Sequence, residues 1–128
     1  MEQLENTVNW FEIYVNDIKR AQKFYETVLN RKMTDMSKDG NKHKMVMFGK
    51  GDLNQYGTNG ALVQMPQMKA GGNSIMVYFY CEDCAVEQNR VEMAGGKVLR
   101  PKFSIGEYGF CSWCIDTEGN QFGLQSMK

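Results

Sequence analysis

The chain has 128 residues, of which 42% are hydrophobic and 12% aromatic, a composition that suits one globular domain with its own core. Fifteen basic residues balance fifteen acidic ones and neither sign forms a block, which argues against a nucleic-acid or anionic-membrane surface. Since there is no secretory signal pattern and no apolar stretch near the roughly 20 residues that cross a bilayer, we expect a cytoplasmic protein with small-molecule or protein partners.

The chain contains an internal repeat, in which residues 9–33 align with residues 75–99 at a constant offset of 66 and without gaps. In both copies, alternating apolar residues predict a strand that runs to an aspartate, Asp17 or Asp83. Each aspartate is a suitable helix N-cap, because its carboxylate can accept hydrogen bonds from the free N–H groups of the first turn. A strand followed by a helix is therefore predicted twice.

Further strands are predicted after each helix, and turn-forming residues separate them. The predicted strands are 44–48 and 60–65 in the first copy and 97–99, 109–115 and 121–126 in the second. Turns are expected at 39–41, 50–52 and 117–120, and the aperiodic stretch 66–73, with a proline and a glycine pair, is typical of a linker. The chain is thus predicted to be a single domain over residues 1–128, with module one at about 7–65, a linker at 66–73 and module two at about 74–127.

The four cysteines form two pairs, CEDC at 81–84 and CSWC at 111–114, and such pairs also occur in zinc sites. At the repeat offset they fall on four apolar residues, Val15, Ile18, Met45 and Phe48. Because a buried free cysteine packs like a small hydrophobic residue, we interpret all four as core residues. Cys111 and Cys114 also point to opposite faces of their predicted strand, so they cannot bind one ion together. Zinc binding and redox sensing are the alternatives.

Three segments of the chain resemble the vicinal oxygen chelate superfamily, which includes glyoxalase I, bleomycin resistance proteins and extradiol dioxygenases. The segments are NWFEIYVNDIKRAQKFYETVL, VEMAGGKVLRPKFSIGEYGF and IDTEGNQFGLQS, and the resemblance extends from about residue 7 to residue 126. It implies an α+β fold of two tandem βαβββ modules that form a curved mixed sheet with an open cleft, commonly built across a homodimer. The internal repeat fits that fold.

Members of this superfamily that bind a metal usually carry histidine or glutamine before the strand-ending aspartate of each module, and glutamate on a last strand. In this chain the first pair of positions holds Trp10 and Met76, and the second pair holds Ala61 and Gly123. None of these side chains suits a divalent ion, which prefers imidazole or carboxylate ligands. We therefore expect no metal and no other cofactor.

The resemblance also implies that the cleft is lined by the strand residues that alternate with core residues. These residues are Trp10, Glu12, Tyr14, Ala61, Met76, Tyr78, Gly123 and Gln125, to which the same alternation adds Tyr80. Such a lining, mostly apolar and aromatic with a few polar groups, suits a small aromatic or cationic ligand. Alternatively, these side chains fill the cleft or a dimer interface.

Glu12 is the candidate catalytic residue, because a carboxylate among aromatic side chains can serve as a general base. A salt bridge or a hydrogen bond to a tyrosine is its alternative role. His43, the single histidine, lies in a lysine-rich turn and is expected in solvent. Glu107 and Tyr108 precede a strand, where they either narrow the cleft or simply form a turn.

Two functions follow from the resemblance and its departures. The first is a metal-free protein that binds a small aromatic or cationic molecule in a dimeric cleft. The second is a lyase or isomerase like glyoxalase I, which has displaced metal ligands such as Glu12 and His43 or works without a metal through Glu12. A dimeric scaffold without a ligand is the remaining alternative.

Overall fold

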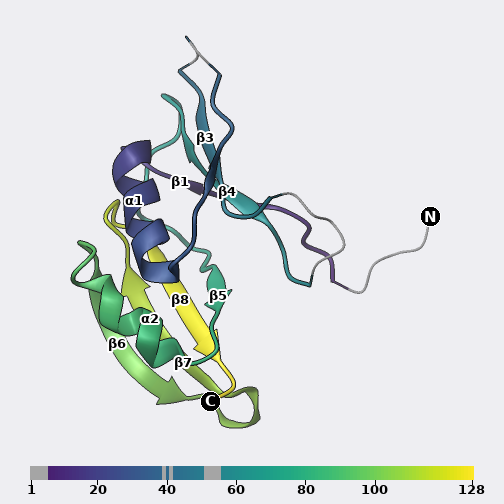
Figure 1. Cartoon of the computed structure of the whole chain (residues 1–128), viewed down its shortest axis with the longest axis vertical. Helices are drawn as coiled ribbons and strands as arrows, with labels where there is room; N and C mark the ends of the chain where they lie inside the picture. Colours follow the sequence, from purple (N-terminus) through teal and green to yellow (C-terminus); the bar gives the residue numbers. More distant parts are fainter. Residues whose placement is uncertain (1–5, 39, 41, 51–55) are drawn as a thin grey trace.

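The computed structural model describes residues 6–38, 40, 42–50 and 56–128. These residues form two mixed four-stranded sheets and two α-helices, and the helices lie together on one side of the sheets (Figure 1). The first sheet has the strand order β1-β4-β3-β2 and the second has the order β5-β8-β7-β6. The predicted pair of βαβββ modules is therefore confirmed, and each module builds a sheet of its own.

The elements follow one another as the repeat predicts. Module one contains β1 (Phe11–Tyr14), α1 (Ile18–Leu29), β2 (Thr34–Asp35), β3 (Lys44–Met47) and β4 (Gly60–Gln64). Module two contains β5 (Tyr78–Tyr80), α2 (Cys84–Val91), β6 (Lys97–Ser104), the short 3-10 helix η1 (Gly106–Tyr108), β7 (Phe110–Ile115) and β8 (Gln121–Ser126). In both modules the first strand pairs in parallel with the last one, and the other pairs are antiparallel.

Both helices begin at the predicted aspartates. The Asp17 carboxylate accepts a hydrogen bond from the backbone N–H of Arg20 at 3.1 Å, and the Asp83 carboxylate accepts one from Ala85 at 3.0 Å. α1 ends at Asn30, which has a left-handed φ of 52°. No helix in the described part of the chain has the length and apolar character that crossing a membrane requires.

Two strands differ from the prediction. β2 is only two residues long, too short to show any periodicity in the sequence. β6 extends to Ser104, beyond the predicted end at residue 99, although Pro101 argues against a long strand. Proline is tolerated on an edge strand and at bulges, and β6 is the edge of its sheet with register shifts in this region. The predicted turns at 39–41 and 50–52 lie partly outside the described residues.

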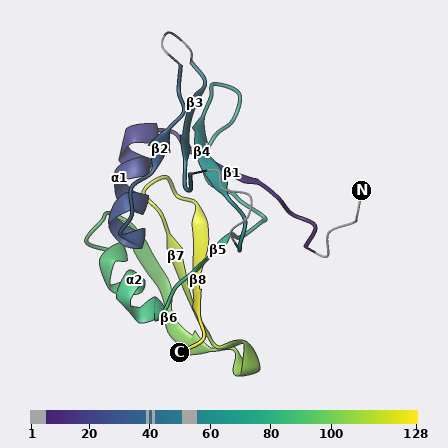
Figure 2. The same ribbon diagram turned by 45° about the vertical axis from the view of Figure 1, so that its right-hand side comes forward.

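The two modules share one aromatic core between the helices and the sheets. Tyr25 of α1 lies 5.4 Å from Phe48 of its own module, measured between ring centroids. It lies 5.7 Å from Phe79 and 5.5 Å from Phe122, both of module two. Phe24 also contacts Phe122, at 5.8 Å. Figure 2 shows the consequence, since α1 and α2 pack one above the other across the module boundary.

The predicted turn at 117–120 belongs to a loop between β7 and β8 that joins module two to module one. Asp116 accepts a hydrogen bond from the Tyr25 hydroxyl at 2.6 Å, and both groups are buried. Asn120 donates from its side-chain nitrogen to the backbone carbonyl of Tyr14 at 2.9 Å. These bonds link the end of β7 to β1 and α1, so the loop fixes one module against the other.

Glu118 in the same loop caps the region before α1. Its carboxylate accepts hydrogen bonds from the backbone N–H groups of Asn16 at 3.0 Å and Asp17 at 2.9 Å. Arg20 donates to it twice, from Nε at 2.7 Å and from Nη2 at 2.9 Å. Because the Glu118 side chain is fully buried while that of Arg20 is 52% exposed, the arginine brings its charge to the carboxylate from solvent.

The pKa values of the two carboxyl groups of this loop are shifted in opposite directions. Burial raises the pKa of Asp116, although hydrogen bonds from Tyr25 and from the loop backbone act in the opposite direction. Burial also pushes the pKa of Glu118 upward, but the hydrogen bonds from Arg20, the Asp17 backbone and Thr117 outweigh it and hold that pKa below its usual value. Glu118 is therefore charged at neutral pH and stabilises the fold in that form.

We predict that Glu118→Gln lowers the free energy of unfolding at neutral pH by about 1–3 kcal/mol, because it removes charge-assisted hydrogen bonds. Since the folded pKa of Glu118 is lowered, this stabilisation is present above the unfolded pKa and is lost as the pH falls through the folded pKa. The difference between wild type and variant should therefore shrink in acid. Urea unfolding between about pH 3 and pH 7 measures it.

The exposed Glu107 supplies the control, as Glu107→Gln should change neither the stability nor its pH dependence. An equal loss of stability in the Glu118 variant at all pH values would contradict the assigned role.

Candidate functional site

Each sheet has a face turned away from the helices, which we call its open face. On sheet one, the predicted residues Trp10, Glu12 and Tyr14 share this face and contact one another. The Trp10 indole donates to one oxygen of the Glu12 carboxylate at 3.1 Å, and the Tyr14 hydroxyl donates to the other at 2.8 Å. This hydrogen bond raises the pKa of Tyr14. Glu12 is thus an exposed carboxylate held in one orientation by two aromatic side chains.

Ala61 lies next to this trio. It is the partner of Glu12 in the register between β1 and β4, and its side chain is completely buried. The structure therefore brings together the four cleft residues predicted in module one.

The remaining predicted residues belong to sheet two. Tyr78 and Gly123 are partners in the register between β5 and β8, and the Tyr78 ring lies over Gly123, where a Cβ atom would collide with it. Tyr80 is the partner of Gln125, whose side-chain nitrogen donates to the Tyr108 carbonyl at 2.8 Å. The space above Gly123 is thus occupied by an aromatic ring.

Met76 precedes β5 and is half-buried. The predicted cleft residues therefore form two groups, one on each open face. Within the described ranges, no hydrogen bond, ion pair or ring contact joins the two groups. That both groups line one cleft stays a prediction.

Three residues of the open face of sheet two were missed in the sequence. Arg100 is the partner of Trp113 in the register between β6 and β7, and its guanidinium carbon lies 3.7 Å from the Phe103 ring centroid. The rings of Phe103 and Trp113 meet edge to face at 5.0 Å. Strand β6 was expected to end at residue 99, before Pro101, and in the longer strand it is the register shifts around Arg100 that bring both Arg100 and Phe103 to this face.

The positions that the resemblance assigns to metal ligands hold groups that do not fit a metal ion. Trp10 donates its indole hydrogen to Glu12, Ala61 has no donor atom, and Gly123 lies under the Tyr78 ring. In addition, no set of three or more histidine, cysteine, aspartate or glutamate side chains is arranged to hold a metal in the described part of the chain. The expectation of a metal-free protein stays a prediction.

Other candidate residues lie at the edges of the sheets. His43 is exposed just before β3, at a position separate from the Glu12 trio. Glu107 and Tyr108 are exposed in η1, and the bond from Gln125 to the Tyr108 carbonyl places η1 beside the open face of sheet two. That η1 narrows a cleft stays a prediction.

Three of the four cysteines belong to the core as expected, namely Cys81, Cys84 and Cys114. Cys111 is buried as expected too, but it lies outside the main core cluster, on the open face of β7 as the partner of Gln125. Its position follows from strand alternation, because Cys111 and Cys114 are three residues apart on β7 and point to opposite faces. All four cysteines are free thiols.

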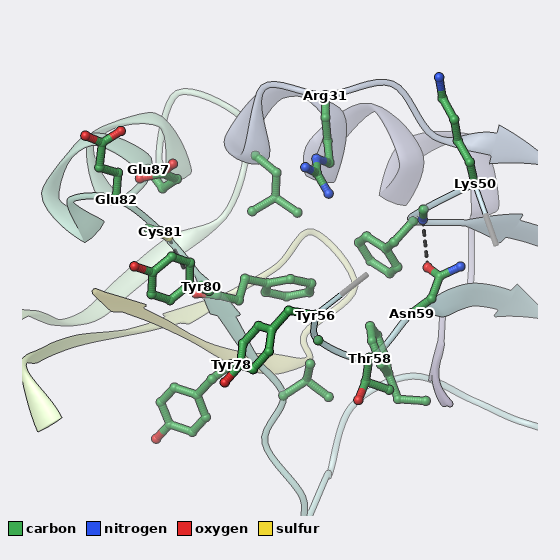
Figure 3. A pocket seen from close by; sticks show the side chains of 17 residues that line it. Arg31, Lys50, Tyr56, Thr58, Asn59, Tyr78, Tyr80, Cys81, Glu82 and Glu87 are labelled. Atoms are coloured by element: carbon green, nitrogen blue, oxygen red, sulfur yellow. Dashed lines mark hydrogen bonds between the residues drawn. The ribbon is translucent and has the colours of Figure 1, made fainter. Parts of the chain in front are cut away.

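A cavity of about 430 Å³ lies between the two modules and reaches the aromatic core (Figure 3). Its floor is aromatic, because Phe11, Phe48 and Phe79 line it with ring centroids 5.3 to 6.3 Å apart. Tyr78 also lines it and so touches both the cavity and the open face.

The polar rim of this cavity differs between the modules. Module one supplies Arg31 and Lys50, whereas module two supplies Glu82 and Glu87 on the opposite side (Figure 3). Among the residues that the structure describes, one carboxylate oxygen of Glu87 is buried without a hydrogen-bond partner. Burial, followed by the charge and hydrogen bond of Glu87, raises the pKa of the neighbouring Cys81 to about 12.

The comparisons with known proteins agree with this architecture. The family model of the Glyoxalase/Bleomycin resistance protein/Dioxygenase superfamily matches residues 7–124. The chain is 27% identical to "Putative glyoxylase CFP32" from Mycobacterium bovis and from Mycobacterium tuberculosis over 129 aligned positions, which cover 96% of this chain and 46% of each relative. It therefore spans about half the length of the curated relatives it matches.

Solved structures give the same result. Glyoxalase I from Zea mays superimposes with a TM-score of 0.73 at 22% identity, over 92% of this chain and 45% of that one. A superfamily member from Sphaerobacter thermophilus has a TM-score of 0.68 at 21% identity, and the match covers 93% of this chain and 95% of that one. At these identities the likeness establishes the fold.

We predict that the thiols react slowly with iodoacetamide in the folded protein, because burial raises the pKa of Cys81, Cys111 and Cys114 and keeps them protonated at about pH 8. Mass spectrometry should count four adducts per chain only after unfolding in guanidinium. Glu87→Gln should lower the pKa of Cys81 and so speed its alkylation, whereas Glu82→Gln on the same rim should not. Rapid alkylation of the folded wild type would contradict this account.

Proposed function

Because the chain belongs to the glyoxalase/bleomycin resistance protein/dioxygenase superfamily, we propose that it binds a small aromatic or cationic molecule in a cleft formed by two copies of the chain. The observation that carries this proposal is the trio of Trp10, Glu12 and Tyr14. Both oxygens of the carboxylate are fixed by hydrogen bonds, and two aromatic rings flank it. A cation gains from the carboxylate charge and from the faces of the rings, so this trio suits an ammonium group.

The exposed aromatic side chains support a cleft made by two chains. Tyr78 is 46% exposed, Tyr80 72% and Tyr108 69%, all on or beside the open face of sheet two. Exposed apolar surface of this kind marks binding faces. In a two-fold dimer, the open face of module one in each copy could meet that of module two in its partner, which would produce two identical clefts.

A lyase or isomerase is the second candidate, as the names of the relatives include glyoxylase and glyoxalase I. The short bond between the Tyr14 hydroxyl and Glu12 favours it, since a carboxylate held beside a hydroxyl can accept a proton and exchange it. Glu12 would then remove and return a proton during isomerisation of an α-oxoaldehyde–thiol adduct. An assay of that isomerisation, with and without added divalent metal, separates this candidate from simple binding.

We predict that Glu12→Gln weakens the binding of benzyltrimethylammonium, a cationic aromatic probe, by about tenfold, because it removes the charge that attracts the cation. Binding can be followed by the nuclear magnetic resonance signal of the Trp10 indole N–H. Glu92→Gln at the exposed end of α2 is the matched control and should bind as the wild type does. Equal weakening in both variants would show that the effect comes from the net charge of the protein and not from a contact with Glu12.

The proposed dimer predicts a mass in solution of twice the chain mass of 14.7 kDa, measured by sedimentation equilibrium. Tyr80→Asp places a charge on the open face and should shift the equilibrium toward the monomer. Tyr56→Asp, at a fully exposed tyrosine, should leave the dimer intact. A wild-type protein that stays monomeric at high concentration would contradict the two-chain cleft.

A further inference from the structure

The open face of sheet two presents a row of four residues, one from each strand. Arg100 of β6 is the partner of Trp113 on β7, which is the partner of Gly123 on β8, which in turn is the partner of Tyr78 on β5. Side chains that are partners in register stand side by side on the same face of a sheet. The row therefore places one cation at the end of an aromatic surface.

Arg100 is oriented by the rings beside it. Its guanidinium carbon lies 3.7 Å from the centroid of Phe103 and 5.5 Å from that of Trp113. In the parts of the chain that the structure describes, no carboxylate or carbonyl accepts a hydrogen bond from this guanidinium. By contrast, Lys102 on the same strand is paired with Asp83 at 2.9 Å. Arg100 is exposed, so its donors are available to a ligand.

The aromatic part of the row is also fixed. The Trp113 indole donates its hydrogen to the Tyr78 hydroxyl at 3.0 Å, which uses the only donor of the tryptophan side chain. Trp113 can therefore offer a ligand only its ring. The Tyr78 hydroxyl accepts this bond and keeps its own hydrogen for donation. The ring of Tyr78 covers Gly123, so the surface is continuous from Trp113 to Tyr78.

We propose that this row binds a planar aromatic molecule that carries a carboxylate or a phosphate group. The ring of the ligand stacks on Trp113, and its anionic group accepts hydrogen bonds from Arg100. A guanidinium matches both anions because it offers parallel N–H donors in one plane. The inference goes beyond the proposed function, since it assigns a second ligand chemistry to a different open face. It concerns sheet two, whereas the Glu12 trio on sheet one selects cations.

The test is a titration of the isotope-labelled full chain with 2-naphthoate, 2-naphthyl phosphate and the neutral 2-naphthamide. The chain has two tryptophans, so the indole N–H signals report separately on Trp10 of sheet one and Trp113 of sheet two. We expect an anionic probe to shift the Trp113 signal and to bind about tenfold more tightly than the amide. The anionic probe that binds more tightly identifies the preferred group, carboxylate or phosphate.

Matched variants separate a specific contact from general attraction. Arg100→Gln should reduce the affinity for the anionic probe about tenfold and leave the amide unchanged. Lys102→Gln removes the same charge from the same strand and should have no such effect. Arg100 is exposed, so its variant should keep the spectrum of the folded protein.

Equal binding of anion and amide, an equal effect of the two variants, or an unmoved Trp113 signal would overturn the proposal. A shift confined to Trp10 would also overturn it, but would leave the proposed function standing. A shift of Trp113 in a protein that stays monomeric would support the Arg100 site while contradicting the two-chain cleft.

Discussion

The buried carboxylates of Asp116 and Glu118 determine how the two modules sit against each other. A buried carboxylate is costly unless its oxygens are bonded, and here Tyr25, Arg20 and backbone N–H groups bond them. The shared aromatic core also stabilises this arrangement, but hydrophobic contact has no direction. Hydrogen bonds do, so the loop fixes the angle between the sheets and with it the positions of both open faces.

The fold was predictable because its signals are local and occur twice. The offset of 66 residues revealed the modules, and Asp17 and Asp83 marked both helix starts. The errors arose where the local sequence pattern does not determine the structure. β2 is too short for periodicity, and the strand limit placed before Pro101 ignored the tolerance of an edge strand for proline. The repeat likewise says that two residues are equivalent without saying whether they face the core, as Cys111 shows.

The sequence predicted which side chains of the candidate site share a face of the sheet, but it did not predict the contacts between them. Alternation correctly put Trp10, Glu12 and Tyr14 side by side, since the period of a strand fixes direction. It could not show that the Tyr78 ring fills the space above Gly123, because that depends on pairing between strands far apart in sequence. The place of Arg100 in the site could not be predicted for the same reason. Its neighbours are set by the register of β6 and β7 and not by its own segment.

The loop that holds the modules together gives the linker an unexpected role. Tyr25 and Arg20 precede Pro66 in the chain, whereas Asp116 and Glu118 follow it, so the bonds that Tyr25 and Arg20 donate to the loop join the two sides of the linker. The two related halves are therefore held together by contacts like those between the subunits of a heterodimer, although they belong to one polypeptide. A short tether keeps one half near the other at an effective concentration of roughly millimolar. Halves separated at the exposed Pro66–Lys69 stretch would thus reassemble with the same contacts, but only above the dissociation constant of their own interface.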